Sequence, residues 1–300
     1  MKTIYIIIIN YGTPADTIEC LESIENNDYK NYKVVILEIQ DLNNSRRMLA
    51  DWINSHNSNK YLMLGLSENK GFAFANNLGI KYATKHNDCE YLWILNNDTV
   101  LKKETISSLV NFYENNSKKL KIGFIGSKIL YYDFPDTIQT VGGKINKWTA
   151  HSKLIGLNKK DKGQYDNKIL KTDYVIGAAM FLHKNLISEI GLMPEEYFLY
   201  AEDKDWSIAA LRRGFTNYVY TRSILYHKEG ASIGNSHKTK EINAPLLKLK
   251  YQNTIKLYRK YYKFQMPILY LAFVKKMLGR FVRREYQEAK IIINVILRRK

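Results

Sequence analysis

Four short apolar runs punctuate the first hundred residues of the chain, at positions 4–9, 32–39, 61–66 and 91–95. Each run is closed by polar or turn-forming residues, a pattern that is typical of a buried strand in a parallel sheet. The segments between the runs carry apolar residues at helical spacing. Strands that alternate with helices in this way predict βαβ units and an α/β fold with a mostly parallel sheet.

The pattern changes after residue 98. Periodicity there predicts, in chain order, a helix over 104–115, a strand over 122–130, a hairpin and a surface loop within 131–171, a short helix over 184–190, a helix from about 202 to 213, a strand over 215–220, a loop from 227, and helices beyond 246. We therefore divide the chain into two halves of one α/β domain, 1–105 and 106–237, and a helical extension, 238–300.

The triplet Asn96, Asn97 and Asp98 directly follows the fourth run. Ligands bind beyond the carboxyl ends of the strands in open α/β sheets, so this triplet falls where a site is expected. A lone carboxylate among amides suits a hard divalent cation whose remaining ligands come from a substrate phosphate. The alternative is an Asn/Asp-rich β-turn, which is common after strands.

Polar and aromatic residues also follow the other three runs. Strand ends of successive βαβ units converge on one crevice, so these groups are expected to line one pocket: Asn10, Tyr11, Glu38, Asp41, Asn69, Gly71 and Asn77. An aromatic ring, amides and acids of this kind are suited to bind a nucleoside diphosphate. The alternative is that each residue is simply one that is common in loops. The sequence lacks the glycine patterns G-x-G-x-x-G and Walker A.

Three acids, Glu202, Asp203 and Asp205, begin a predicted helix behind an aromatic run. Helix capping explains acids at this position, but a carboxylate beside an aromatic wall can also act as a general base toward a hydroxyl. We expect His227 to have a structural role unless it binds a metal ion together with Asp98.

The formal net charge of +17 indicates an anionic partner, and basic residues crowd between 238 and 300. The two cysteines, Cys20 and Cys89, form no metal or disulfide pattern and are expected to be buried thiols in a reducing compartment. The apolar start is interpreted as a strand, and no apolar run is long enough to span a bilayer. We expect a cytoplasmic protein.

Six motifs occur in a fixed order over about residues 3–235: Ile-Ile-Asn-Tyr at 8–11, Glu-Asn-Lys-Gly-Phe at 68–72 with Asn-Asn-Leu-Gly at 76–79, Leu-Asn-Asn-Asp at 95–98, Gly-Ala-Ala-Met-Phe at 177–181, Phe-Leu-Tyr-Ala-Glu-Asp-Lys-Asp at 198–205, and His227 with Gly230 and Ser232. Together they resemble the inverting family 2 glycosyltransferases of the GT-A fold, in particular the bacterial rhamnosyltransferase-like branch.

The resemblance implies a nucleotide-sugar-binding half and an acceptor-binding half. Asp98 matches the last acid of the family's DXD motif, which holds Mn²⁺ or Mg²⁺ against the donor diphosphate, and Asn96 stands where the first acid usually is. Asp203 matches the catalytic base, with Asp205 as a weaker second choice. His227 matches a histidine that completes the metal site in some members.

One motif departs from the family pattern. The family usually carries Asp-Asn-x-Ser directly after the second strand, where the Asp reads the uracil or thymine ring. Here either Asp41 or Glu38 takes that role, and Asp41 is favoured because Asn43, Asn44 and Ser45 follow it.

The basic extension contains an amphipathic segment. Val274, Met277, Leu278 and Phe281 share one helical face, surrounded by Lys275, Lys276, Arg280, Arg283 and Arg284. Such a helix can lie on an anionic membrane, although a helical hairpin packed on the domain fits the pattern too.

The expected function is transfer of a sugar from a dTDP or UDP donor, with dTDP-rhamnose first, to a glycan or polyprenyl-linked acceptor at the inner face of the cell membrane. The alternatives are an inactive relative that serves as a scaffold and a basic nucleic-acid-binding protein. Nucleic acid is not the expected partner, because no helix-turn-helix or RNP motif is present.

Overall fold

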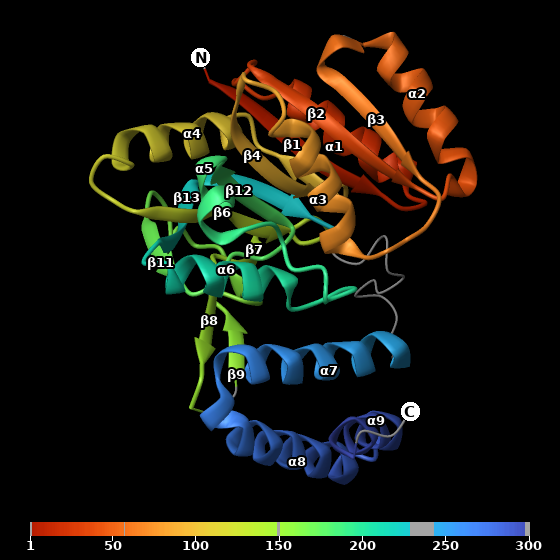
Figure 1. Ribbon diagram of the computed structural model, residues 1–300, viewed down its shortest axis with the longest axis vertical. Helices are drawn as coiled ribbons and strands as arrows, with labels where there is room; N and C mark the ends of the chain where they lie inside the picture. The colour runs from red at the N-terminus through yellow and green to blue at the C-terminus, as the bar shows by residue number, and fades with distance from the viewer. Residues whose placement is uncertain (1, 57, 149–150, 229–242, 298–300) are drawn as a thin grey trace.

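The computed structural model describes residues 2–56, 58–148, 151–228 and 243–297. These residues build a mixed sheet of eleven strands, in which eight follow the order β10-β7-β6-β12-β4-β1-β2-β3. Figure 1 shows this α/β domain above three C-terminal helices. The predicted α/β class, with a mostly parallel first half and a helical extension, is confirmed.

The first half of the domain has the predicted alternation of strands and helices. Its elements are β1 (Thr3–Asn10), α1 (Pro14–Glu25), β2 (Tyr32–Ile39), η1 (Leu42–Asn44), α2 (Ser45–Ser55), η2 (Ser58–Lys60), β3 (Tyr61–Leu66), α3 (Phe72–Ala83) and β4 (Cys89–Asn96). Strand β1 lies between β2 and β4 in parallel. The register pairs Ile9 with Asn96 and Asn10 with Glu38, which sets the three strand ends side by side.

The second half extends the sheet from β4 with antiparallel neighbours. Its elements are β5 (Thr99–Leu101), α4 (Thr105–Asn116), β6 (Ile122–Tyr131), β7 (Thr137–Thr140), β8 (Gly143–Asn146), β9 (His151–Leu154), β10 (Lys159–Lys160), β11 (Ile169–Thr172), β12 (Ala179–His183), α5 (Asn185–Ile190), α6 (Glu202–Arg212) and β13 (Thr216–His227). Strand β12 runs antiparallel to β4, so one sheet joins the two halves.

Helices cover both faces of the sheet. Leu21 of α1, Trp52 of α2 and Leu109 of α4 belong to one buried cluster, whereas Ile80 of α3 and Trp206 of α6 belong to the cluster on the other face. Both cysteines are buried free thiols, as predicted. The close approach of α3 to the sheet depends on Gly79, because a Cβ there would lie 2.5 Å from Ile7 Cγ2.

The strand predicted over 215–220 continues to His227. Beyond a register irregularity between Tyr220 and Ile224, β13 pairs again with β6 and also with β5. These long-range pairings convert the expected loop start into the end of a strand. Gly230 and Ser232, which completed the histidine motif, lie outside the described residues.

The extension forms helices α7 (Ala244–Tyr261), η4 (Lys263–Gln265), α8 (Met266–Val282) and α9 (Tyr286–Ile296). They share a small core of their own that includes Tyr251, Leu269, Phe273 and Ile292. Helix α7 lies between the α/β domain and the pair α8 and α9 (Figure 1). Within the described ranges, no helix combines the length and the apolar content needed to cross a membrane.

Candidate functional site

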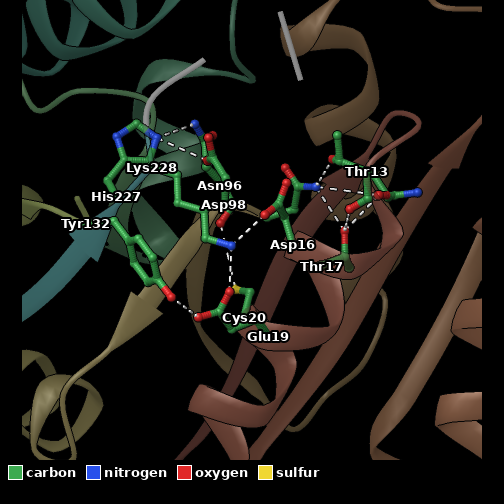
Figure 2. A network of polar contacts seen from close by, with 12 residues as sticks. Thr13, Asp16, Thr17, Glu19, Cys20, Asn96, Asp98, Tyr132, His227 and Lys228 are labelled. Atoms are coloured by element: carbon green, nitrogen blue, oxygen red, sulfur yellow. Dashed lines mark hydrogen bonds and ion pairs between the residues drawn. The ribbon is translucent and has the colours of Figure 1, made fainter. Parts of the chain in front are cut away.

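Asp98 and His227 meet at the carboxyl edge of the sheet (Figure 2). Asp98 follows β4 and His227 ends β13, and the pairing of His227 with Thr99 brings the two side chains together. Asp98 Oδ1 lies 3.1 Å from His227 Nε2. Both residues are buried, with exposed fractions of 4% and 6%.

Gln139, on β7, fixes the tautomer of this histidine. His227 Nδ1 lies 2.9 Å from Gln139 Oε1, and an amide oxygen can only accept, so Nδ1 carries the hydrogen. In the neutral imidazole the lone pair of Nε2 then faces the Asp98 carboxylate. Two acceptors that face each other at this distance require a cation between them, either a proton or a metal ion.

The donor set fits a hard or borderline divalent cation that is completed by a substrate. A carboxylate oxygen and an imidazole nitrogen are suitable ligands, and the hydrogen bond from Nδ1 to an amide oxygen is the usual support of a metal-binding histidine. Within the described part of the chain, no group of three or more His, Cys, Asp or Glu residues forms a complete protein site.

Asn96 lies beside this pair. Its side-chain nitrogen is 3.4 Å from His227 Nε2, and its backbone carbonyl accepts a hydrogen bond from the Thr99 hydroxyl at 2.8 Å. The structure thus brings together Asn96, Asp98 and His227. We call these three residues the metal edge, after the role predicted for them.

Asn97, Asn10 and Glu38 point instead into a buried network below the strand ends. The Asn97 side chain donates to Thr13 Oγ1 at 2.8 Å and to Thr17 Oγ1 at 2.9 Å, and Asn10 donates to Glu38 Oε2 at 2.6 Å. These three residues were expected to contact the donor. Their hydrogen bonds tie β1, β2 and β4 together, so the structure gives them a scaffolding position.

Glu38 differs from Asp41 in its availability to a ligand. Glu38 is fully buried, and its second oxygen accepts from the Ser45 hydroxyl. Asp41 is exposed, and one of its oxygens accepts from the Arg46 amide at 2.8 Å. The neighbouring Asn43 donates to Gly12 O at 3.1 Å, which places this loop beside the turn that carries Tyr11.

Asn69, Gly71 and Asn77 connect α3 to the segment that precedes the acids. Asn69 accepts from the Gly71 amide at 3.0 Å, and a Cβ on Gly71, which has φ +97°, would lie 2.4 Å from Phe198 O. The Asn77 side chain is buried and hydrogen-bonded to both backbone groups of Met193. These residues, expected at the donor, build the approach between α3 and the loop before α6.

Asp203 lies in the first turn of α6 and is partly exposed. Its carboxylate accepts from the amide of Gly177 at 3.1 Å and from that of Lys204 at 2.7 Å. Burial raises the pKa of Asp203, and the charge of Lys204 and these amides offset only part of that effect. A carboxylate with a raised pKa is better suited to accept a proton near neutral pH.

Glu202 and Asp205, predicted as further catalytic candidates, have other environments. Glu202 is buried, and burial together with the charge of Asp203 raises its pKa to about 8. Asp205 is buried and accepts from Tyr197 at 2.8 Å, from Tyr261 at 2.6 Å and from Lys260 at 2.8 Å. Its carboxylate is therefore engaged by two tyrosine hydroxyls and a lysine ammonium.

Lys228, which belongs to none of the sequence motifs, ties the end of β13 to α1 and to the backbone of Asp98 (Figure 2). Its ammonium lies 2.5 Å from both Asp16 Oδ1 and Glu19 Oε2 of α1, and its amide donates to Asp98 O at 3.0 Å. The Tyr132 hydroxyl also donates to Glu19, at 2.6 Å. The only sequence signal was a lysine next to a predicted ligand, because the carboxylates that pair with it lie more than 200 residues away.

Comparison with known proteins adds a family assignment to this geometry. The sequence model of the family described as glycosyl transferase family 2 matches residues 5–191. The chain is 23% identical over 249 residues to the dTDP-rhamnosyl transferase RfbF of Shigella flexneri, which covers 82% of this chain and 74% of that protein. It is 25% identical over 211 residues to the low-salt glycan biosynthesis hexosyltransferase Agl10 of Haloferax volcanii, covering 69% of this chain and 61% of that protein.

Two solved structures share the fold. A mannosyltransferase from Pyrobaculum calidifontis, PcManGT, solved with GDP-Man and Mn²⁺, has a TM-score of 0.60 at 12% identity and covers 99% of this chain and 86% of its own. GalNAc-T7, solved with UDP, GalNAc and Mn²⁺, has a TM-score of 0.64 at 15% identity, and the match covers 86% of this chain and 48% of that one. The similarity confirms the predicted GT-A architecture.

Replacing Lys228 with methionine tests the ion pairs behind Asp98. Burial alone would raise the pKa of Glu19, but hydrogen bonds from Lys228 and Tyr132 outweigh it and lower that pKa. Glu19 therefore stabilises the fold above its unfolded pKa, and this contribution is lost as the pH falls through the lower folded value. We expect Lys228→Met to lower the free energy of unfolding by about 1–2 kcal/mol near pH 7.

Urea unfolding near pH 7 and near pH 3 measures both parts of this prediction. The deficit of the variant should shrink in acid, as protonation of Glu19 removes its ion pair in the wild type. Lys103→Met, at an exposed lysine, is the control and should change little. A deficit of equal size at both pH values would contradict the ion-pair explanation.

Proposed function

The chain belongs to glycosyl transferase family 2, and from this premise we propose that it is an inverting, metal-dependent glycosyltransferase. In this proposal Asp98 and His227 hold Mn²⁺ or Mg²⁺ at the diphosphate of a nucleotide sugar. Asp203 accepts the proton of the acceptor hydroxyl. The observation that carries the proposal is the 3.1 Å approach of Asp98 Oδ1 to His227 Nε2, with Nδ1 committed to Gln139.

The chemistry follows from the roles proposed for these groups. A divalent cation at Asp98 and His227 would stabilise the charge that grows on the leaving nucleoside diphosphate. Asp203 removes the hydroxyl proton while that oxygen attacks the anomeric carbon from the face opposite the leaving group. One base is sufficient for such a displacement, and the anomeric configuration inverts.

The donor we propose is a dTDP- or UDP-sugar, with dTDP-rhamnose first and UDP-hexoses or UDP-galactofuranose after it. The name of the Shigella flexneri relative specifies a dTDP-rhamnosyl transferase, and its alignment covers 82% of this chain. Asp41 is the acid proposed to read the base, because its carboxylate is exposed beside the Tyr11 turn, whereas Glu38 is buried.

The acceptor we propose is a hydroxyl of a glycan or polyprenyl-linked sugar used for cell-surface polysaccharide at the inner face of the membrane. An exposed apolar strip on α8 supports a position at that surface: Leu271, Val274, Leu278, Phe281 and Val282. Met277, expected on this strip, packs instead into the core shared with α7 and α9. Lys275, Arg283 and Arg284 are exposed near the strip and complement anionic lipid.

Two substitutions separate donor binding from transfer. Asp98→Asn removes the carboxylate charge at the metal edge, so the Mn²⁺-dependent thermal stabilisation by dTDP- or UDP-sugars should be lost. Asp203→Asn removes the base but leaves the metal edge intact, so that stabilisation should remain while transfer to an acceptor falls by about 10²–10⁴-fold.

Glu202→Gln is the matched control for Asp203→Asn. Because Glu202 is protonated near neutral pH, the amide resembles its existing form, and the variant should keep most of the transfer activity. Wild-type behaviour of Asp98→Asn in both assays, or full transfer by Asp203→Asn, would refute the assigned roles.

Sedimentation with vesicles tests the surface of α8. Wild-type protein should bind vesicles that contain anionic phosphatidylglycerol more strongly than pure phosphatidylcholine vesicles, and a Leu278→Ser, Phe281→Ser double variant should bind roughly tenfold or more weakly, because burial of both side chains is lost. Trp148→Ser, which removes an exposed apolar residue of the α/β domain, should bind like the wild type. Equal binding by all three proteins would exclude this surface as the membrane contact.

A further inference from the structure

Helix α7 contacts the segment that carries Asp203 on both sides of that residue. On the N-terminal side, the contact is made by Asn253, which is fully buried. Its side-chain nitrogen donates to Leu199 O at 2.8 Å and to Tyr200 O at 3.1 Å. One side chain of the extension thus holds two consecutive carbonyls of the loop that leads into α6.

The backbone of this loop has a conformation that needs support. Tyr200 and Ala201 have φ values of +70° and +80°, in a region that residues with a Cβ rarely adopt. Each such residue costs roughly 1 kcal/mol or more and persists only where surrounding contacts impose it. The two hydrogen bonds from Asn253 fall directly on this strained turn, two residues before Asp203.

On the C-terminal side, α7 holds Asp205. Lys260 and Tyr261, which end the helix, bind its carboxylate at 2.8 and 2.6 Å. Lys256 donates to Glu196 O at 3.0 Å, ahead of the loop. The segment from 196 to 205 is therefore fixed to α7 at its start, at its strained turn and just beyond Asp203.

We propose that Asn253 is a positioning residue for the reaction: it holds the turn at Tyr200 and Ala201 so that the Asp203 carboxylate faces the acceptor hydroxyl. This inference rests on the proposed role of Asp203 as base. It makes the first helix of the extension part of the catalytic apparatus, independently of any contact between α8 and a membrane. Asn253 touches no reacting atom and acts through the backbone.

The test compares transfer with donor binding in full-length Asn253→Ala, using a soluble acceptor and no vesicles. Asp98 follows β4 and His227 ends β13, whereas Asn253 binds Leu199 and Tyr200, so the affinity for a dTDP- or UDP-sugar with Mn²⁺ should stay within about twofold. The kcat for transfer should fall by about 10–100-fold, because a small displacement of a reacting group has an effect of this size. Gln252→Ala, at the exposed neighbouring position, is the control and should match the wild type.

Asn253→Asp is a second variant that keeps the shape of the side chain but replaces the donor group by an acceptor that faces two carbonyls. It should lower kcat at least as much as Asn253→Ala. An unchanged kcat in a folded variant, a parallel loss of kcat and donor affinity, or failure of both variants to fold would overturn the positioning role. Full transfer by Asp203→Asn would instead refute the proposed function, so the two failures are distinguishable.

Discussion

The candidate site depends on one long-range approach, that of Asp98 to His227. The two residues are 129 positions apart in the chain, and the pairing of β13 with β5 and β6 brings them within 3.1 Å. Gln139 orients the imidazole, and Lys228 ties the end of β13 to α1 and to the backbone of Asp98. Because each support comes from a different element, the second half of the domain must fold onto the first before this metal edge exists.

The strand ends serve two purposes at the same edge. Asn10, Asn97 and Glu38 are engaged in hydrogen bonds that connect three strands below the proposed metal position. Asp98 and Asn96 instead lie against His227. Helix α6 carries Asp203 in its first turn, and α7 holds the loop before it. The proposed metal ligands and the proposed base are thus supported by separate parts of the structure.

The local pattern was sufficient to predict the strands at 32–39 and 61–66, whose observed bounds match the predicted ones. Short buried apolar runs between turn residues are compatible with few other secondary structures. The same pattern placed polar residues at the strand ends but did not distinguish inward from outward side chains, so Glu38 and Asn97 were assigned to the ligand. Gln139, Lys228 and Asn253 escaped prediction because their roles depend on partners 53–212 residues away. Contacts of that separation are set by tertiary packing and leave no periodic signal in a single sequence.

Pulsed electron paramagnetic resonance of Mn²⁺ bound together with dTDP or UDP tests the metal edge most directly. The spectrum should show one directly coordinated imidazole nitrogen, and His227→Gln should abolish that coupling. His56→Gln, at a histidine that stacks on Trp52 on α2, is the control and should leave the spectrum unchanged. Mn²⁺ that binds with the nucleotide but shows no imidazole coupling, or a coupling that survives in His227→Gln, would contradict the assignment of Asp98 and His227 to the metal.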